Sequence, residues 1–133
     1  MADWPAAVVL AGITKPLDGF SVLRGLDLSI APGSVTALLG PSGCGKTTAL
    51  RIVAGLEDAD AGTVEIGGVV AAGPGVNVPT EQRRVGMIFQ NGALFPHLSV
   101  AHNVGYGLAR ADRKDGPRIS EMLELVGLAG FGD

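Results

Sequence analysis

The sequence predicts an α/β fold organised around a phosphate-binding turn. An apolar run at 35–39 leads directly into a glycine-rich turn at 40–45, and a helical pattern follows it. A second apolar run at 85–89 has the composition of a strand buried on both faces, which is typical of α/β proteins. Two further regions, 6–30 and 62–70, have the alternation and the turn residues of antiparallel hairpins. These patterns favour a strand–turn–helix core beside an antiparallel sheet.

The composition fits a packed domain and excludes several function classes. The chain has 133 residues, of which 47% are hydrophobic and 17% charged, as in globular proteins. The net charge of −3 gives no basic footprint for nucleic acid, and Gln82-Arg83-Arg84 and the basic residues of 110–114 are expected on a solvated surface. The single cysteine, Cys44, allows neither an internal disulfide nor a cysteine-based metal site. No apolar run approaches the roughly 20 residues that span a bilayer, so we expect no direct membrane insertion.

The N-terminal part is expected to form a hairpin at the edge of a sheet. Residues 6–13 have the composition of a strand, and residues 23–30 alternate apolar and polar from Leu26 onward. The sequence Ala31-Pro32-Gly33-Ser34 then has turn chemistry, because proline presets φ and glycine tolerates positive φ.

The next expected elements surround the phosphate-binding turn. Residues 35–39 are predicted to be a buried strand and residues 48–54 a helix, which Gly55 would end in the left-handed conformation. Residues 62–70 are predicted to form a second hairpin around a Gly-Gly pair. Residues 71–84 are expected to be a loop because they contain several glycines and prolines.

The C-terminal part is expected to contain one strand and two helices. The predicted elements are a strand at 85–89 that ends at Gln90, a loop at 91–98, and helices at 100–108 and 117–126. Ser99 can cap the first of these helices, because a serine oxygen accepts a bond from the first turn. Gly127 would end the second.

The glycine-rich turn carries a P-loop motif. Its residues are Gly40, Pro41, Ser42, Gly43, Cys44, Gly45, Lys46 and Thr47. The glycines let successive backbone N–H groups point at phosphate oxygens, and the following helix adds partial positive charge. Lys46 can reach the β- and γ-phosphates, and Thr47 offers a hydroxyl oxygen of the kind that Mg²⁺ prefers. The motif predicts a protein that binds a nucleotide of the ATP kind together with Mg²⁺.

Beyond the P-loop, the chain resembles the ATP-binding subunits of ABC transporters from about residue 8 onward. Residues 39–48 are similar to the family's Walker A motif, and residues 84–90, Arg-Val-Gly-Met-Ile-Phe-Gln, resemble the strand that leads into its Q-loop. Residues 94–100 resemble the start of its helical subdomain. The likeness is greatest to importer subunits of the ferric-iron, polyamine and sulfate type, and residues 70–84 favour the ferric-iron branch.

The resemblance implies an incomplete P-loop NTPase core with an N-terminal antiparallel β subdomain. Residues 1–133 would then be a partial ATPase domain. The β subdomain and P-loop core would extend to about residue 90, and the start of the helical subdomain would occupy about 91–133.

The resemblance also implies ligands, partners and a location. Phosphate and Mg²⁺ would be held by Gly43, Gly45, Lys46, Thr47 and Thr48. Gln90 would contact Mg²⁺ and the attacking water, so that Lys46 and Gln90 serve catalysis and Thr47 and Gln90 the metal. Residues Phe95 to Leu98 would face a membrane-spanning permease, and a second ATPase subunit would complete a dimer. The protein would be cytoplasmic and held on the inner face of the cell membrane through the permease.

The chain departs from the family's pattern at the adenine-binding position. The family usually stacks the adenine on an aromatic residue at a place that Leu17, or its neighbour Pro16 or Asp18, holds here. Phe20 lies close by in sequence and is expected to substitute for it.

Several family motifs have no match in these 133 residues. They are the signature Leu-Ser-Gly-Gly-Gln, the Walker B acid, the adjacent catalytic glutamate and the switch histidine. His97 and His102 precede the signature region, and Glu121 and Glu124 are expected on a solvated helix face. The sequence is therefore interpreted as the N-terminal portion of an importer ATPase that couples ATP hydrolysis to solute uptake. The chain alone is expected to have little or no ATPase activity.

Two other interpretations remain open at the level of the sequence, and a third is disfavoured. The chain could be a nucleotide-binding or interaction fragment without catalysis, or a non-functional truncated product. A small P-loop kinase is disfavoured, because no acceptor-site or lid residues are found.

Overall fold

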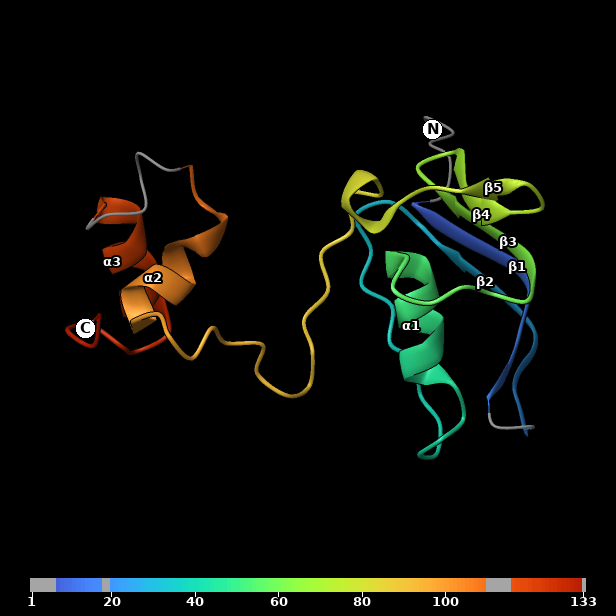
Figure 1. Ribbon diagram of the computed structural model, residues 1–133, viewed down its shortest axis with the longest axis horizontal. Coiled ribbons are helices and arrows are strands. Elements are labelled where there is room, and N and C mark those ends of the chain that lie inside the picture. Colours follow the sequence, from blue (N-terminus) through green and yellow to red (C-terminus); the bar gives the residue numbers. More distant parts are fainter. Residues whose placement is uncertain (1–6, 18–19, 110–115, 133) are drawn as a thin grey trace. The chain divides into compact units, whose positions relative to one another are not determined.

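In the computed structural model, the described residues of the first of two units form a five-stranded antiparallel sheet, an α-helix and a short 3-10 helix (Figure 1). The structure describes residues 7–17, 20–109 and 116–132, without the side chains of residues 17, 20 and 21. The chain divides into a first unit, Met1–Met87, and a second unit, Ile88–Asp133. Each unit has its own internal packing and is described separately.

The sheet of the first unit has the strand order β2-β1-β3-β4-β5. The strands are β1 (Val8–Leu17), β2 (Phe20–Ile30), β3 (Ala61–Ile66), β4 (Val69–Gly73) and β5 (Val76–Asn77). The pairs β1–β2 and β3–β4 confirm both predicted hairpins, and β2 lies at an edge of the sheet. The turn between β3 and β4 uses Gly67 and Gly68, whose φ values of 57° and 81° suit a two-residue hairpin turn.

The prediction of a loop at 71–84 is wrong for its first part. Strand β4 continues to Gly73, and β5 pairs back on it through a turn at Pro74 and Gly75. Gly75 has a φ of 75°, a left-handed conformation that glycine adopts without strain. The glycines and proline therefore mark a third hairpin, and a short 3-10 helix, η1 (Thr80–Gln82), follows it.

Helix α1 (Lys46–Ala54) follows the P-loop and begins two residues earlier than predicted. Gly55 ends it at a φ of 77°, as predicted, and Leu56 N–H bonds back to Arg51 O at 2.9 Å. Helix α1 packs against the sheet with its buried face. The buried core residues are Leu10, Ile13, Leu23, Ala49, Ile52, Val64 and Ala71.

The two apolar runs 35–39 and 85–89 do not form strands, so both strand predictions are wrong. Val35 is 100% exposed, Leu39 91% and Ile88 98%. A strand buried on both faces needs hydrogen-bonded neighbours and covering layers, and the described residues provide neither beside these runs. The α/β class is confirmed as an antiparallel sheet with helices, while its parallel core strands are not formed.

The described residues of the second unit include the α-helices α2 (Val100–Val104) and α3 (Pro117–Leu125). Ser99 caps α2 as predicted, because its hydroxyl accepts a bond from His102 N–H at 3.3 Å. Helix α2 is shorter than the predicted 100–108, and the 3-10 helix η2 (Gly105–Gly107) follows it because glycine has low helix propensity. No helix within the described ranges has the length and apolar character to cross a membrane.

Candidate phosphate-binding site

The P-loop lies in the first unit, after the turn at Pro32 and Gly33, and its last two residues, Lys46 and Thr47, begin α1. Gly43 and Gly45 have φ values of 79° and 94°, which a side chain would strain. Gly45 is the N-cap of α1 and lies against β2, where a Cβ would come 2.6 Å from Leu23 Cδ2. The same Cβ would come 3.1 Å from Val22 O, so the Gly45 backbone lies close to both the side chains and the backbone of β2.

Lys46 folds back over the loop that precedes it. Its Nζ donates to Gly40 O at 2.8 Å and to Pro41 O at 2.7 Å. A weaker contact joins Nζ to Cys44 Sγ at 3.4 Å. The ammonium charge thus lies beside the N-terminus of α1, and the N-cap glycine supplies no side chain to that end of the helix. A lysine charge and a helix N-terminus at one place attract anions, so the arrangement fits a phosphate chain.

The structure brings residues 40–48 together and leaves the remaining predicted site residues apart from them. Ser42 and Thr47 are exposed and Thr48 is half-buried. Gln90 is exposed and belongs to the second unit, which the structure describes separately. The side chain of Phe20, expected at the adenine, lies outside the described residues.

Arg83 is a residue that the sequence analysis placed incorrectly. It was expected on a solvated surface, but it is 6% exposed, whereas its neighbour Arg84 is exposed as expected. Its guanidinium donates to backbone carbonyls and to Asn77, and burial lowers the pKa of Arg83 while Asp58 raises it. The composition gave no sign that Arg83 is buried, because buried arginines are rare and the neighbouring residues 80–84 are polar. The other basic run, 110–114, lies outside the described residues.

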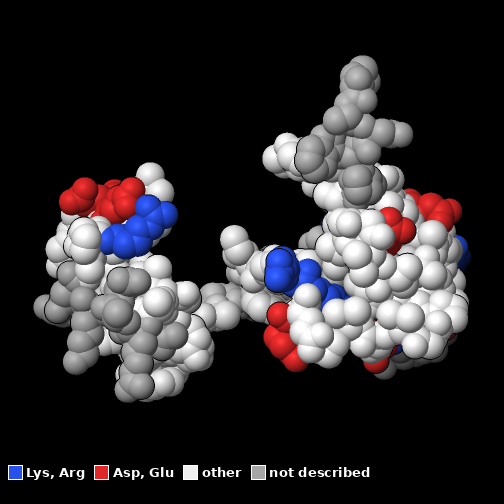
Figure 2. Space-filling model, turned by 90° about the horizontal axis from the view of Figure 1, so that it is seen from above, with Lys and Arg blue, Asp and Glu red and all other residues white. Residues whose placement is uncertain are grey.

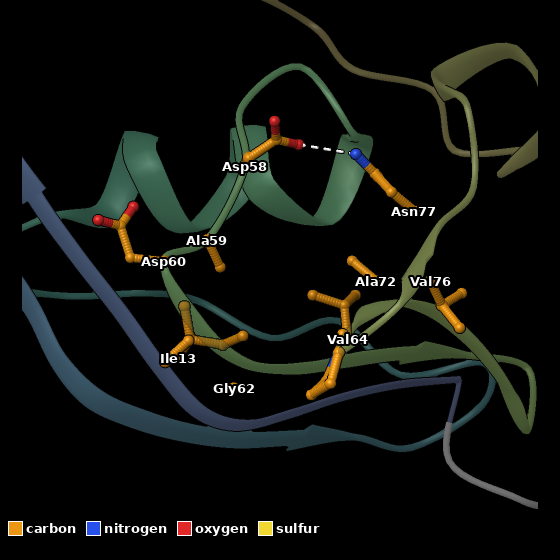
Figure 3. Close-up of a pocket in the computed structure, with 12 residues that line it drawn as sticks. Ile13, Asp58, Ala59, Asp60, Gly62, Val64, Ala72, Val76 and Asn77 are labelled. Carbon is orange, nitrogen blue, oxygen red and sulfur yellow. Dashed lines mark hydrogen bonds between the residues drawn. The ribbon is translucent and has the colours of Figure 1, made fainter.

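A cavity of about 420 Å³ lies elsewhere in the first unit and is not lined by the P-loop (Figure 3). Apolar side chains such as Ile13 and Val64 line it, together with two carboxylates. Asp60 pairs with Lys15 at 3.0 Å, and Asp58 accepts a bond from Asn77 at 3.0 Å. Since both carboxylates already have partners, the chemistry of the chain favours the P-loop and not this cavity as the nucleotide site.

In the second unit, Asn103 organises the segment that was expected to face a permease. Its Oδ1 accepts from Phe95 N–H at 2.8 Å, and its Nδ2 donates to Phe95 O, Leu98 O and Ser99 O at 3.0 to 3.2 Å. The Phe95 ring lies 4.3 Å from the Tyr106 ring, centroid to centroid. Sequence reasoning missed Asn103, because one asparagine in a helical pattern carries no local signal of a tertiary role.

Residues 88–109 contain no charged side chain, which leaves this part of the second unit with an uncharged surface. The charged side chains described in the second unit are Arg118, Glu121 and Glu124 of α3. Arg118 pairs with Glu121 at 2.8 Å, and both glutamates are exposed as expected. Figure 2 shows the acidic and basic side chains of the second unit side by side at one end of the visible face.

Comparison with known proteins supports the resemblance to the ATP-binding subunits of ABC transporters. Residues 23–133 match the family described as ABC transporter. An Fe(3+) ions import ATP-binding protein from Rhodococcus jostii is 51% identical over 122 residues, and one from Mesorhizobium japonicum is 46% identical over 119. A spermidine/putrescine import ATP-binding protein from Aliivibrio fischeri is 45% identical over 127 residues.

These alignments cover 92%, 90% and 93% of this chain but only 35%, 33% and 33% of the respective relatives. The chain therefore spans about a third of the length of the curated relatives it matches. The family match covers well over half of the chain and includes the P-loop, α1 and both helices of the second unit. The chain belongs to the ABC transporter family.

Proposed function

We propose that this chain forms part of the ATP-binding subunit of an importer that couples ATP binding and hydrolysis to solute uptake, with ferric iron as the solute. The observation that carries the proposal is the P-loop, whose Lys46 ammonium lies beside the N-terminus of α1. Family membership and the iron-import relatives support it. The spermidine/putrescine relative makes an organic polycation the alternative solute.

The site residues divide the work of binding ATP and Mg²⁺. Backbone N–H groups of residues 43–48 and the Lys46 ammonium hold the phosphates, and Phe20 stacks on the adenine. The Thr47 hydroxyl and the Gln90 amide oxygen are the oxygen donors for Mg²⁺, which neutralises phosphate charge when bound. Gln90 also orients the attacking water.

The partners follow from the same family role. The segment 95–98, which Asn103 holds in place, contacts a membrane-spanning permease, and the uncharged run 88–109 suits an apolar partner surface. A second ATPase subunit completes the nucleotide site. The subunit works on the cytoplasmic face of the membrane, where the permease holds it.

Residues 1–133 alone bind ATP but turn it over slowly. None of these residues matches the family's Walker B acid or catalytic glutamate. The residues that bind the phosphates are therefore present without a side chain that activates the attacking water. Turnover of ATP by the purified chain at the rate of a working transporter, dependent on Lys46, would contradict this part of the proposal.

A titration with MgATP tests the proposed nucleotide site. Lys46→Ala removes the ammonium, and the affinity for MgATP is expected to fall at least about tenfold, because a charge-assisted bond to phosphate contributes about 1.5–3 kcal/mol. Isothermal calorimetry of the purified chain measures the change. Lys15→Ala is the matched control, since Lys15 lies in the same unit and pairs with Asp60. Equal affinities for Lys46→Ala and the unmodified chain would exclude the P-loop as the binding site.

A further inference from the structure

Arg83 is a charged residue in the interior of the first unit. Its guanidinium donates to four neutral acceptors, and no carboxylate touches it at bonding distance in the described contacts. Nε bonds to Val78 O at 2.7 Å and Nη2 to Asn77 Oδ1 at 2.8 Å. A buried charge is costly unless its donors are satisfied, so this arrangement holds one guanidinium in one defined place.

Two of the four acceptors belong to the last turn of α1. Nη1 donates to Ile52 O at 2.8 Å and to Val53 O at 3.3 Å. Carbonyls at a helix C-terminus lack partners within the helix and carry partial negative charge, so a cation there stabilises the final turn. Arg83 therefore caps the C-terminal end of the helix whose N-terminal end carries the P-loop.

The segment 77–83 is joined to this end of α1 at further points. Thr80 Oγ1 donates to Gly55 O at 2.5 Å. Gly55 lies so close to the guanidinium that a Cβ there would come 2.7 Å from Arg83 Nε. Asn77, which accepts from Arg83, also donates to Asp58, and this second bond is drawn in Figure 3. We call residues Asn77, Thr80 and Arg83, with the carbonyls they bind, the C-terminal clamp of α1.

At the opposite end of α1, Gly45 packs on β2 against Leu23, and Lys46 bonds back to Gly40 O and Pro41 O in the loop before the helix. Helix α1 has nine residues and is about 13 Å long, too short to be stable on its own. Its buried residues Ala49 and Ile52 hold its middle on the sheet. Because α1 is short and moves as one rigid element, the position of its first turn depends on the contacts at both of its ends. Figure 1 shows the loop before α1 at one end of the helix and the segment after β5 near the other.

We infer that Arg83 is a positioning residue for nucleotide binding, which fixes the P-loop by holding the C-terminal turn of α1. The inference rests on the proposed function, in which the P-loop binds ATP. Without the guanidinium, the carbonyl of Val53 loses the donor described here, that of Ile52 keeps only the Gly55 N–H at 3.2 Å, and the last turn loosens. The first turn then no longer holds its N–H groups at one distance from the phosphates, and bonds to phosphate depend on that geometry.

The test compares two adjacent arginines in the full chain. Arg83→Gln removes the buried charge, and Arg84→Gln makes the same change of charge at an exposed position. MgATP affinity is measured by calorimetry at a temperature at which circular dichroism shows each variant to be folded. We expect affinity about tenfold weaker for Arg83→Gln and within about twofold of the unmodified chain for Arg84→Gln. Pyrophosphate as the probe should show the same loss, because the effect acts on the phosphate cradle.

Affinity of the folded protein separates positioning from a merely structural role. If Arg83→Gln lowers the melting temperature but binds MgATP and pyrophosphate as tightly as the unmodified chain, the inference is wrong. Failure of the unmodified chain to bind MgATP would instead overturn the proposed function on which the inference rests.

Two milder variants keep the test decisive if Arg83→Gln does not fold. Arg83→Lys keeps the charge but not the fork of donors, and its affinity is expected to fall by about threefold to tenfold. Thr80→Val removes a different clamp contact, the bond to Gly55 O, and should weaken phosphate binding by about twofold to threefold. Unchanged affinities in both of these variants would overturn the inference.

Discussion

At the scale of single residues, Gly55 shows how two constraints act on one position. It has a φ of 77°, and a Cβ would also lie 2.7 Å from Arg83 Nε. Gly55→Ala is therefore expected to lower the free energy of unfolding of the first unit by about 2–4 kcal/mol, the sum of left-handed strain and overpacking. Urea unfolding followed by circular dichroism measures the change.

Gly33→Ala separates the two constraints on Gly55. Gly33 lies in the same unit at a φ of 68°, but a Cβ there would meet nothing within 4 Å. Its replacement should cost only the backbone strain, about 1–2 kcal/mol. Equal losses for both variants would show that the contact with Arg83 adds nothing to the requirement for glycine at Gly55.

At the scale of elements, Asn103 is expected to hold the segment 95–99 in its described conformation. Asn103→Ala removes four hydrogen bonds, so Phe95 should leave the ring of Tyr106. Tyr106 is the single tyrosine, so labelling with 3-fluorotyrosine gives one fluorine resonance. We expect that resonance to move towards the value of free fluorotyrosine, with a loss of about 1–2 kcal/mol in the stability of the second unit.

Two further variants serve as references for the fluorine resonance of Tyr106. Phe95→Leu removes the neighbouring ring and gives the resonance of an unstacked Tyr106. Asn91→Ala changes an exposed asparagine in the same unit and should leave the resonance in place. A resonance for Asn103→Ala that stays at the position of the unmodified chain would show that the aromatic contact does not depend on Asn103.

Elements whose determinants are local could be predicted from the sequence. The Gly-Gly turn of the β3–β4 hairpin, the Gly55 stop of α1 and the Ser99 cap of α2 each depend on a few adjacent residues, and all three are observed. The P-loop motif is also local, and the left-handed conformations of Gly43 and Gly45 agree with the predicted tight turn. The runs 35–39 and 85–89 failed because a strand needs partners that the run itself does not contain.

The same reasoning explains the two side chains that the sequence did not reveal. Burial of Arg83 depends on carbonyls at Ile52 and Val53, which lie 31 and 30 positions away in sequence. The bonds of Asn103 reach back to residue 95 across a turn that has no regular period. Neither contact leaves a pattern in composition or spacing, so only the folded chain shows them.

At the scale of the whole molecule, the run 35–39 should govern self-association of the chain. Val35 and Leu39 are 100% and 91% exposed, and exposed apolar side chains promote association. The double variant Val35→Lys/Leu39→Lys is expected to reduce large species in light scattering. Its free energy of unfolding should stay within about 0.5 kcal/mol of the unmodified chain, because neither side chain is packed.

The same double variant distinguishes the observed conformation from the predicted buried strand. Two lysines in a strand covered on both faces would cost several kcal/mol each through desolvation, and the first unit would then unfold. Ile52→Lys is the positive control and is expected to unfold the first unit, since Ile52 is 1% exposed on the buried face of α1. A double variant that unfolds as Ile52→Lys does would mean that 35–39 is buried in solution. A double variant that stays folded and associates less would mean that the run is an open apolar surface in these 133 residues.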